Sequence, residues 1–114
     1  PSTKLLVADQ LADSDPQKRV ILDFIHLYEE VYDFDRQFPI NTHSGYAWDA
    51  VAIVTEAIRR AGTEPAALRD AIEETKNFIG VSGVYNLTAE DHNGLDVDSM
   101  VMVEVREGRF TLAR

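Results

Sequence analysis

His26 and Glu29 are the first residues whose types and spacing could do chemistry. They lie three apart in a helix-forming stretch, so both side chains share one helix face and can reach a metal ion. A zinc-binding helix supplies a second histidine one turn away, and this stretch has none. A solvent-exposed helix edge explains the pair better, and we expect no metal site. A metal-dependent enzyme that uses His26, Glu29 and Glu30 is one alternative function for this sequence.

A second acidic group lies near the C-terminus. Asp91, Asn93, Asp96 and Asp98 alternate like the oxygen ligands of a calcium loop. Gly94 is misplaced for such a loop, however, and no glutamate closes it at the twelfth position. We therefore interpret the segment as a polar turn.

The third candidate is the polar stretch of residues 41–45, which contains His43, Ser44 and Gly45. It directly precedes a helix-forming run, and the N–H groups at a helix N-terminus can receive an anion. A capping or surface role explains His43 about as well. Tyr46 and Trp48 follow and could line an apolar pocket, although aromatic residues at helical spacing more often belong to a core.

Catalytic motifs are not found in this sequence. It has no nucleophile elbow, phosphate-binding glycine loop or dinucleotide fingerprint. We therefore expect a protein that is not an enzyme and needs no cofactor.

The composition of the chain narrows its possible partners and cellular location further. The chain has 114 residues, enough for one domain, and 20 acidic against 11 basic residues give a net charge of -9. This charge argues against nucleic acid as a partner. The sequence has no cysteine, which fits both cytoplasm and periplasm. No apolar run is long enough to span a bilayer, and the first four residues do not form a signal peptide.

Three helices are predicted in the first two thirds of the chain. Asp15 before Pro16 marks the start of the first helix, and the second runs from about Tyr46 to Ala61, closed by Gly62. The third starts at Pro65 and ends near Asn77. Their apolar faces predict these buried residues: Val20, Phe24, Leu27, Val51, Val54, Ile58, Leu68 and Ile72. On the second helix the predicted face also includes Ala47, Ala50 and Ala61.

β-structure is expected at both ends of the chain. The apolar run of residues 4–8 could form a short buried strand, and Val84 to Leu87 resembles a strand in composition. Residues 100–105 and 109–112 flank Glu107 and Gly108, which predicts a hairpin. The fold class is therefore α/β, with three helices packed on β-structure and a C-terminal β-hairpin.

Several stretches together resemble the C-terminal region of periplasmic branched-chain amino acid binding proteins, the receptors of ABC importers with the type I periplasmic binding fold. The resemblance rests on the order and spacing of KLLVADQL with DSDPQK, HSGYAWDA, EAIRRAG, ALRDAIE, and GVSGVYN followed by DHNG. No one of these stretches is diagnostic alone.

The resemblance implies two lobes joined by crossing segments, with a ligand bound between them and closure by hinge motion. Residues 1–114 would form one C-terminal segment. About 15–98 would lie in the lobe shared with a missing N-terminal part, and about 99–114 would return to the second lobe. The crossings would lie at residues 8–13 and just before Met100.

The family's site pattern maps onto the loop before the second helix and gives His43, Ser44, Tyr46 and Trp48 as ligand-binding residues, with His43 foremost. Histidine there departs from the aromatic or apolar group common for aliphatic ligands. The implied function is binding a branched-chain amino acid, or a related small amino or organic acid, for an ABC permease in the periplasm. The alternative is a ligand-sensing domain of a signalling or regulatory protein with the same fold. A lobe without its partner strands is also expected to self-associate.

Overall fold

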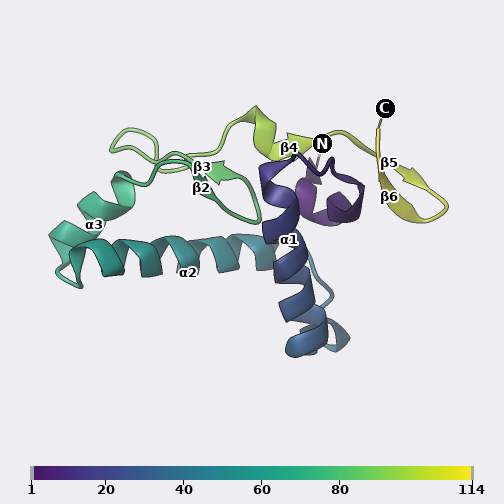
Figure 1. Ribbon diagram of the computed structural model, residues 1–114, viewed down its shortest axis with the longest axis horizontal. Coiled ribbons are helices and arrows are strands. Elements are labelled where there is room, and N and C mark those ends of the chain that lie inside the picture. Colours follow the sequence, from purple (N-terminus) through teal and green to yellow (C-terminus); the bar gives the residue numbers. More distant parts are fainter. Residues whose placement is uncertain (1, 114) are drawn as a thin grey trace.

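The computed structural model describes residues 2–113 and has an elongated, open shape (Figure 1). Its Cα radius of gyration is 15.4 Å, whereas a compact chain of this length is expected at about 13 Å. Its accessible surface is 7673 Å², against about 6,300 Å² expected for a compact protein of this mass. The segment thus exposes more surface than a self-contained domain.

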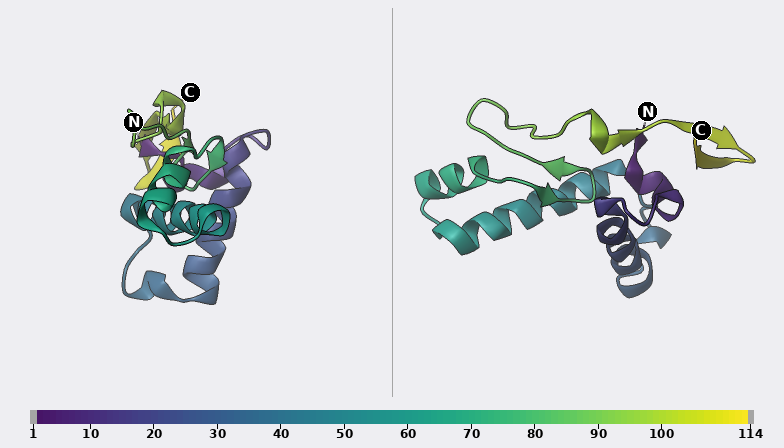
Figure 2. Two further views of the ribbon diagram at one scale, coloured as in Figure 1. Left: turned by 90° about the vertical axis from the view of Figure 1, so that its left-hand side faces the viewer. Right: turned by 45° about the horizontal axis from the view of Figure 1, so that its top comes forward.

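The elements in chain order are β1 (Ser2–Thr3), a 3-10 segment (Lys4–Gln10), α1 (Pro16–His26), a π-helical turn (Leu27–Val31), a 3-10 turn (Phe34–Arg36), α2 (Thr42–Ala61), α3 (Pro65–Glu73), β2 (Phe78–Ile79), β3 (Val84–Tyr85), a 3-10 turn (Val97–Ser99), β4 (Met100–Val101), β5 (Val103–Arg106) and β6 (Arg109–Leu112). In the described residues the strands form three antiparallel pairs, β1 with β4, β2 with β3, and β5 with β6. Figure 1 shows α2 and α3 lying beneath the β2–β3 segment, and the right-hand view of Figure 2 shows the β5–β6 hairpin projecting at the end opposite α3.

The helix starts confirm the capping signals of the sequence. The Asp15 carboxylate accepts from the Gln17 N–H, with Pro16 at the first helical position. Glu64 caps α3 in the same way ahead of Pro65. Helix α2 starts earlier than predicted, at Thr42, because Asn41 rather than a later residue forms its cap. Helix α3 ends at Glu73 and not near Asn77.

The prediction of a short strand at residues 4–8 is wrong. Lys4–Gln10 forms a 3-10 segment whose Leu5, Val7 and Ala8 are buried. Lys4 pairs with Asp15 at 2.9 Å, which ties this segment to the start of α1. Leu5 and Ala8 join a core with Leu11, which follows this segment, with Ile21 and Phe24 of α1, and with Val81 of the loop after β2. Burial, and not strand pairing, explains the apolar run.

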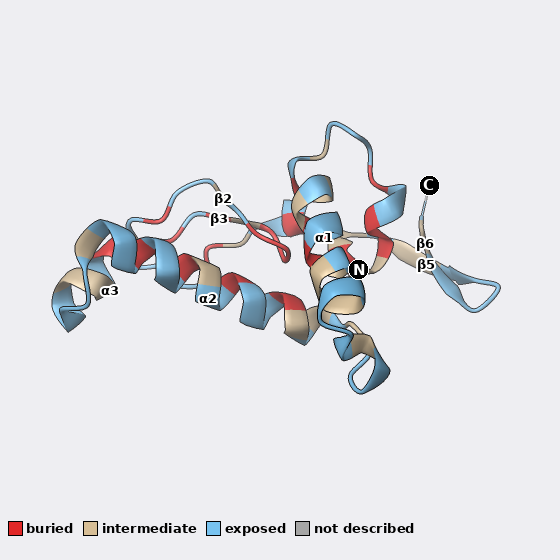
Figure 3. Cartoon of the chain, turned by 60° about the horizontal axis from the view of Figure 1, so that its bottom comes forward, coloured by how far each residue is buried: buried red, intermediate tan, exposed pale blue. Residues whose placement is uncertain are grey.

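The predicted buried face of α2 is also wrong. Val51, Val54 and Ile58 are exposed, at 67%, 38% and 37% of their surface. The residues that α2 buries are Gly45, Asp49, Ile53 and Ala57. Figure 3 shows this buried stripe turned toward β2 and β3, with exposed residues on the other side of the helix. Ile53 packs with Tyr85 and Leu87 in a second core cluster.

The remaining core predictions are partly confirmed. Phe24 is buried, and Val20, Leu27, Leu68 and Ile72 are half-buried. The C-terminal hairpin is confirmed, with Val103 paired to Leu112 and Arg106 to Arg109. Glu107 and Gly108 both have positive φ, as the tight turn of a two-residue hairpin requires. The fold class is therefore α/β, with the helices packed on β-structure as predicted.

Candidate functional site

A cavity of about 640 Å³ lies where β1, the first turns of α2, the β2–β3 loop and the segment before β4 meet. Its walls are formed by Ser2, Thr3, Thr42, Tyr46, Ser82, Asn93, Leu95, Asp96, Val97, Ser99 and Met100. Six of these eleven residues carry a hydroxyl group, although most of the cavity surface is apolar, and among these residues only Asp96 carries a charge. The cavity therefore offers hydrogen bonds to a small polar molecule.

One hydroxyl in this wall has no protein partner. Thr3 is 9% exposed, and its Oγ1 atom is buried without a hydrogen bond. A buried hydroxyl without a partner costs free energy, but this atom has almost no accessible surface and is not open to a molecule in the cavity. Asp96 and Ser99 are, in contrast, used locally, since Asp96 caps the turn at Asp98 and the Ser99 hydroxyl donates to the Asp96 carbonyl.

The four residues predicted from the sequence do not converge on this cavity. Tyr46 lines it, together with the unpredicted Thr42. Ser44 and Trp48 line a groove on another side of α2. Helical spacing explains the separation, because residues four apart share a face whereas residues two apart do not. His43 is exposed, and its ring lies 6.3 Å from that of Tyr46 in an edge-on arrangement.

The N-terminus of α2 is already capped. The Asn41 side-chain oxygen accepts from the N–H groups of His43 at 2.9 Å and Ser44 at 3.3 Å. The Asn41 N–H donates to the Ser44 Oγ at 3.3 Å, which completes a capping box, and the Ser44 hydroxyl in turn donates to the Asn41 carbonyl at 2.6 Å. These two N–H groups are therefore not free for an anion, one of the two roles that the sequence left open at this position.

The groove that holds Ser44 and Trp48 is aromatic and has a volume of about 340 Å³. Trp48 packs against Phe24 with ring centroids 5.4 Å apart, and Tyr28 meets Phe34 at 5.6 Å. Trp48 thus belongs to a packing surface between α1 and α2.

Asp49 and Gln17 are the polar residues that sequence reasoning missed. Both are 1% exposed, and both bind the backbone of the β2–β3 loop, residues 80–83. Asp49 also accepts from the Tyr85 hydroxyl at 3.1 Å. The available signal was the Gly80-Val81-Ser82-Gly83 sequence, since closely spaced glycines mark a point where the backbone is approached closely.

Tyr85 carries a perturbed ionisation. Its burial, followed by the nearby Asp49 carboxylate, raises the pKa of the phenol well above its ordinary value of 10.0. The hydroxyl thus stays protonated and donates to Asp49 throughout the physiological range.

The possible metal sites are explained by other contacts. His26 pairs with Glu30 at 3.1 Å, and Asp91 accepts from the N–H groups of Asn93 and Gly94. Across residues 2–113, no group of three or more acidic, histidine or cysteine residues could hold a metal ion. Within the same part of the chain, no helix is long and apolar enough to cross a membrane.

Comparison with known proteins gives matches among solved structures. One extracellular ligand-binding receptor from Rhodopseudomonas palustris matches with a TM-score of 0.79 and 26% identity, over 98% of this chain and 33% of the receptor. A second from the same species matches with a TM-score of 0.79 and 28% identity, over 98% of this chain and 32% of the receptor. No protein-family model and no curated protein matches the chain.

The chain therefore has the fold of the C-terminal part of extracellular ligand-binding receptors. It spans about one third of their length. The resemblance inferred from the sequence is confirmed at the level of the receptor fold, the type I periplasmic binding fold.

Proposed function

We propose that these residues form part of an extracytoplasmic solute-binding protein that binds a small amino or organic acid between two lobes and delivers it to an ABC importer. A branched-chain amino acid is the first ligand to test. The proposal rests on one observation, the match along 98% of this chain to extracellular ligand-binding receptors. The protein would have no chemistry of its own, and its location would be the periplasm.

The strand pairs support the two-lobe arrangement. β1 pairs with β4, with Ser2 opposite Val101 and Thr3 opposite Met100. The chain thus enters and leaves the helical part at one place, and the β5–β6 hairpin projects beyond it (Figure 1). We infer that β1 and β4 are the crossings, in place of the residues 8–13 expected from the sequence. The hairpin would belong to the second lobe.

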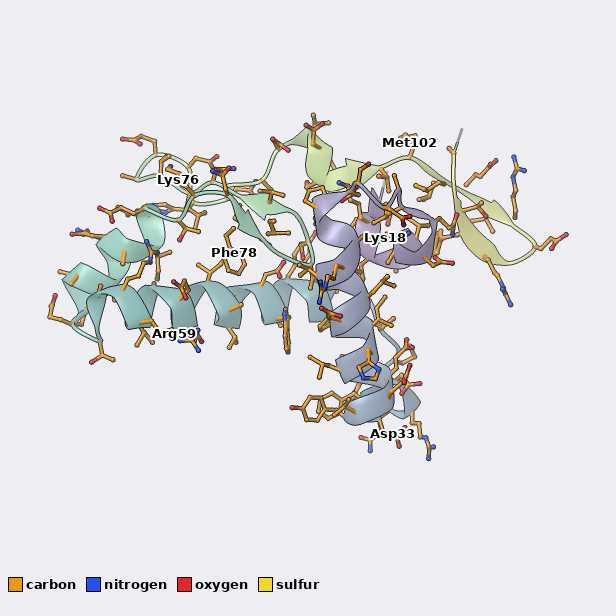
Figure 4. The ribbon with its side chains drawn as sticks, in the orientation of Figure 1. Lys18, Asp33, Arg59, Lys76, Phe78 and Met102 are labelled. Carbon is orange, nitrogen blue, oxygen red and sulfur yellow. The ribbon has the colours of Figure 1, made fainter. Side chains whose placement is uncertain are left out.

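The exposed apolar face of α2 supports a larger protein. Val51 and Val54 are exposed, whereas the buried stripe of α2 is turned toward β2 and β3 (Figure 3). Figure 4 shows Phe78 between β2 and α2, and Arg59 on the opposite side of the helix. We infer that the remaining two thirds of the receptor cover this apolar face.

The cavity beside Tyr46 is our candidate for the part of the ligand site supplied by this segment. It adjoins the β1–β4 crossing, and its hydroxyl-rich wall suits a polar ligand. His43 stays a predicted ligand residue, at the edge of Tyr46. Ser44 and Trp48, on the other face, are not part of this cavity.

Calorimetry on the full-length protein tests the proposal, with L-leucine, L-isoleucine and L-valine as first probes and with small carboxylic acids next. Tyr46→Phe and Ser82→Ala each remove one hydroxyl from the cavity wall. Loss of one ligand hydrogen bond, about 1 kcal/mol, would weaken binding roughly fivefold. Tyr32→Phe is the matched control, since Tyr32 is exposed and lies outside the cavity. Equal affinities for all these proteins would remove the cavity from the site.

A further inference from the structure

The β2–β3 loop is buried, although it is a hairpin loop. Residues 80–83 are all buried, and Val81 is fully enclosed in the first core cluster. Loops normally lie at the surface because a buried loop leaves backbone N–H and C=O groups without partners. Figure 3 shows the buried tip of this hairpin beside α1. Its backbone therefore needs partners from inside the protein.

Asp49 supplies the acceptors. Its Oδ1 accepts from the Val81 N–H at 2.7 Å, and its Oδ2 accepts from the Ser82 N–H at 2.8 Å. Both distances are typical of charge-assisted hydrogen bonds. A Cβ atom at Gly80 would lie 2.8 Å from the Asp49 carboxylate atoms. The close approach thus depends on a glycine at this position.

Gln17 supplies the donors. Its Nε2 donates to the Gly80 carbonyl at 3.1 Å and to the Val81 carbonyl at 3.3 Å. The Gly80 N–H donates to the Gly83 carbonyl at 2.8 Å and closes the loop. Two buried side chains, one from α1 and one from α2, thus hold the same loop by its N–H groups and its carbonyls.

The held loop forms one wall of the cavity. Ser82 lines the cavity, and its Oγ would lie 3.3 Å from a Cβ atom placed on Gly45, the neighbour of Tyr46. Movement of the loop by an ångström would therefore change both the Ser82 wall and its packing on α2.

We propose that Asp49 and Gln17 are positioning residues that fix loop 80–83 before a ligand enters, so that this wall of the cavity is preformed. The ligand part of this inference rests on the proposed function, but the rigidity of the loop does not. Preformed walls favour binding because the ordering cost is met during folding.

Amide hydrogen exchange of the isotopically labelled full-length protein tests the rigidity. The Val81 and Ser82 amides are expected to exchange at least 100-fold more slowly than the Glu90 and His92 amides of the exposed loop. Adding L-leucine should leave the Val81 and Ser82 rates unchanged. Rates in the wild-type protein that match the exposed loop, or that fall only when L-leucine is bound, would overturn the proposal.

Variants separate positioning from general stability. Asp49→Asn, and Gly80→Ala with both side chains intact, should speed exchange at Val81 and Ser82 at least tenfold, while the Ile53 and Ala57 amides of α2 stay protected. Tyr85→Phe is the matched control, because it removes one Asp49 contact but neither loop bond. If Asp49→Asn does not fold, Gly80→Ala and the wild-type measurement decide.

Ligand affinity and amide exchange are separate measurements and test separate parts of the proposal. Asp49→Asn should weaken L-leucine binding at least tenfold, and unchanged affinity with a loosened loop would contradict a positioning role. If L-leucine does not bind the wild-type protein, the proposed ligand class fails, whereas the exchange rates still decide whether the loop is held.

Discussion

The replacement Asp49→Ala should be among the most destabilising single changes in this segment. It removes the acceptor of two backbone N–H groups, from Val81 and Ser82, inside a buried loop. Each buried donor left without a partner costs about 1–3 kcal/mol. The Tyr85 hydroxyl loses its acceptor as well. We expect the free energy of unfolding to fall by about 3–6 kcal/mol, a large part of the roughly 5–15 kcal/mol typical of a domain.

Urea unfolding of the full-length protein, followed by circular dichroism, measures this loss. Asp70→Ala is the matched control, because Asp70 is an exposed helix residue that pairs only with its neighbour Arg69 among the contacts described. Its unfolding midpoint should not change. A loss below about 1 kcal/mol for Asp49→Ala would refute the reasoning, since it would mean that the loop amides find other partners.

Three further predictions concern the core, the titration of Tyr85 and the exposed surface. Ile53→Ala should lower the free energy of unfolding by about 2–5 kcal/mol in the same assay, because Ile53 is 7% exposed and packs in the second cluster. Since the folded protein raises the pKa of Tyr85, its contribution is fully present below the ordinary pKa of about 10 and is lost as pH rises further. Tyr85→Phe should therefore reduce the loss of stability above about pH 10, and an unchanged alkaline profile would contradict this. Residues 1–114 alone should form dimers or larger assemblies by light scattering, and Val51→Lys should reduce them, because Val51 is 67% exposed on an apolar face. A monodisperse monomer would show that the segment closes its own core.

Local signals in the sequence predicted much of the fold. Asp15 with Pro16, Glu64 with Pro65, and Glu107 with Gly108 each act within a few residues, through a cap or a tight turn. Such signals do not depend on contacts with distant parts of the chain. They fixed the helix starts of α1 and α3 and the C-terminal hairpin.

The face of α2 could not be predicted, because this helix has two candidate faces. The stripe of Val51, Val54 and Ile58 is more apolar than the stripe that is buried here, which contains Asp49. Periodicity reports how apolar a face is, but not which partner it meets. In the proposed receptor both faces are covered, one by β2 and β3 and the other by the remaining two thirds of the protein.

The candidate site was predicted only in part for a related reason. Tyr46 lies in the cavity, but the sequence placed Trp48 beside it although the two residues lie on different helix faces. Asp49 was not singled out, because a carboxylate in a helix is usually exposed. Its role depends on Val81 and Ser82, more than thirty residues away along the chain. Long-range partners of this kind leave no local pattern.

Native mass spectrometry of the full-length protein, as purified and after addition of small amino and organic acids, tests the central claim most directly. The account predicts one small molecule bound per protein, released on unfolding, with lower occupancy in Tyr46→Phe and Ser82→Ala than in Tyr32→Phe. A protein that carries no small molecule and takes up none of the added acids would contradict the claim that it is a solute-binding receptor.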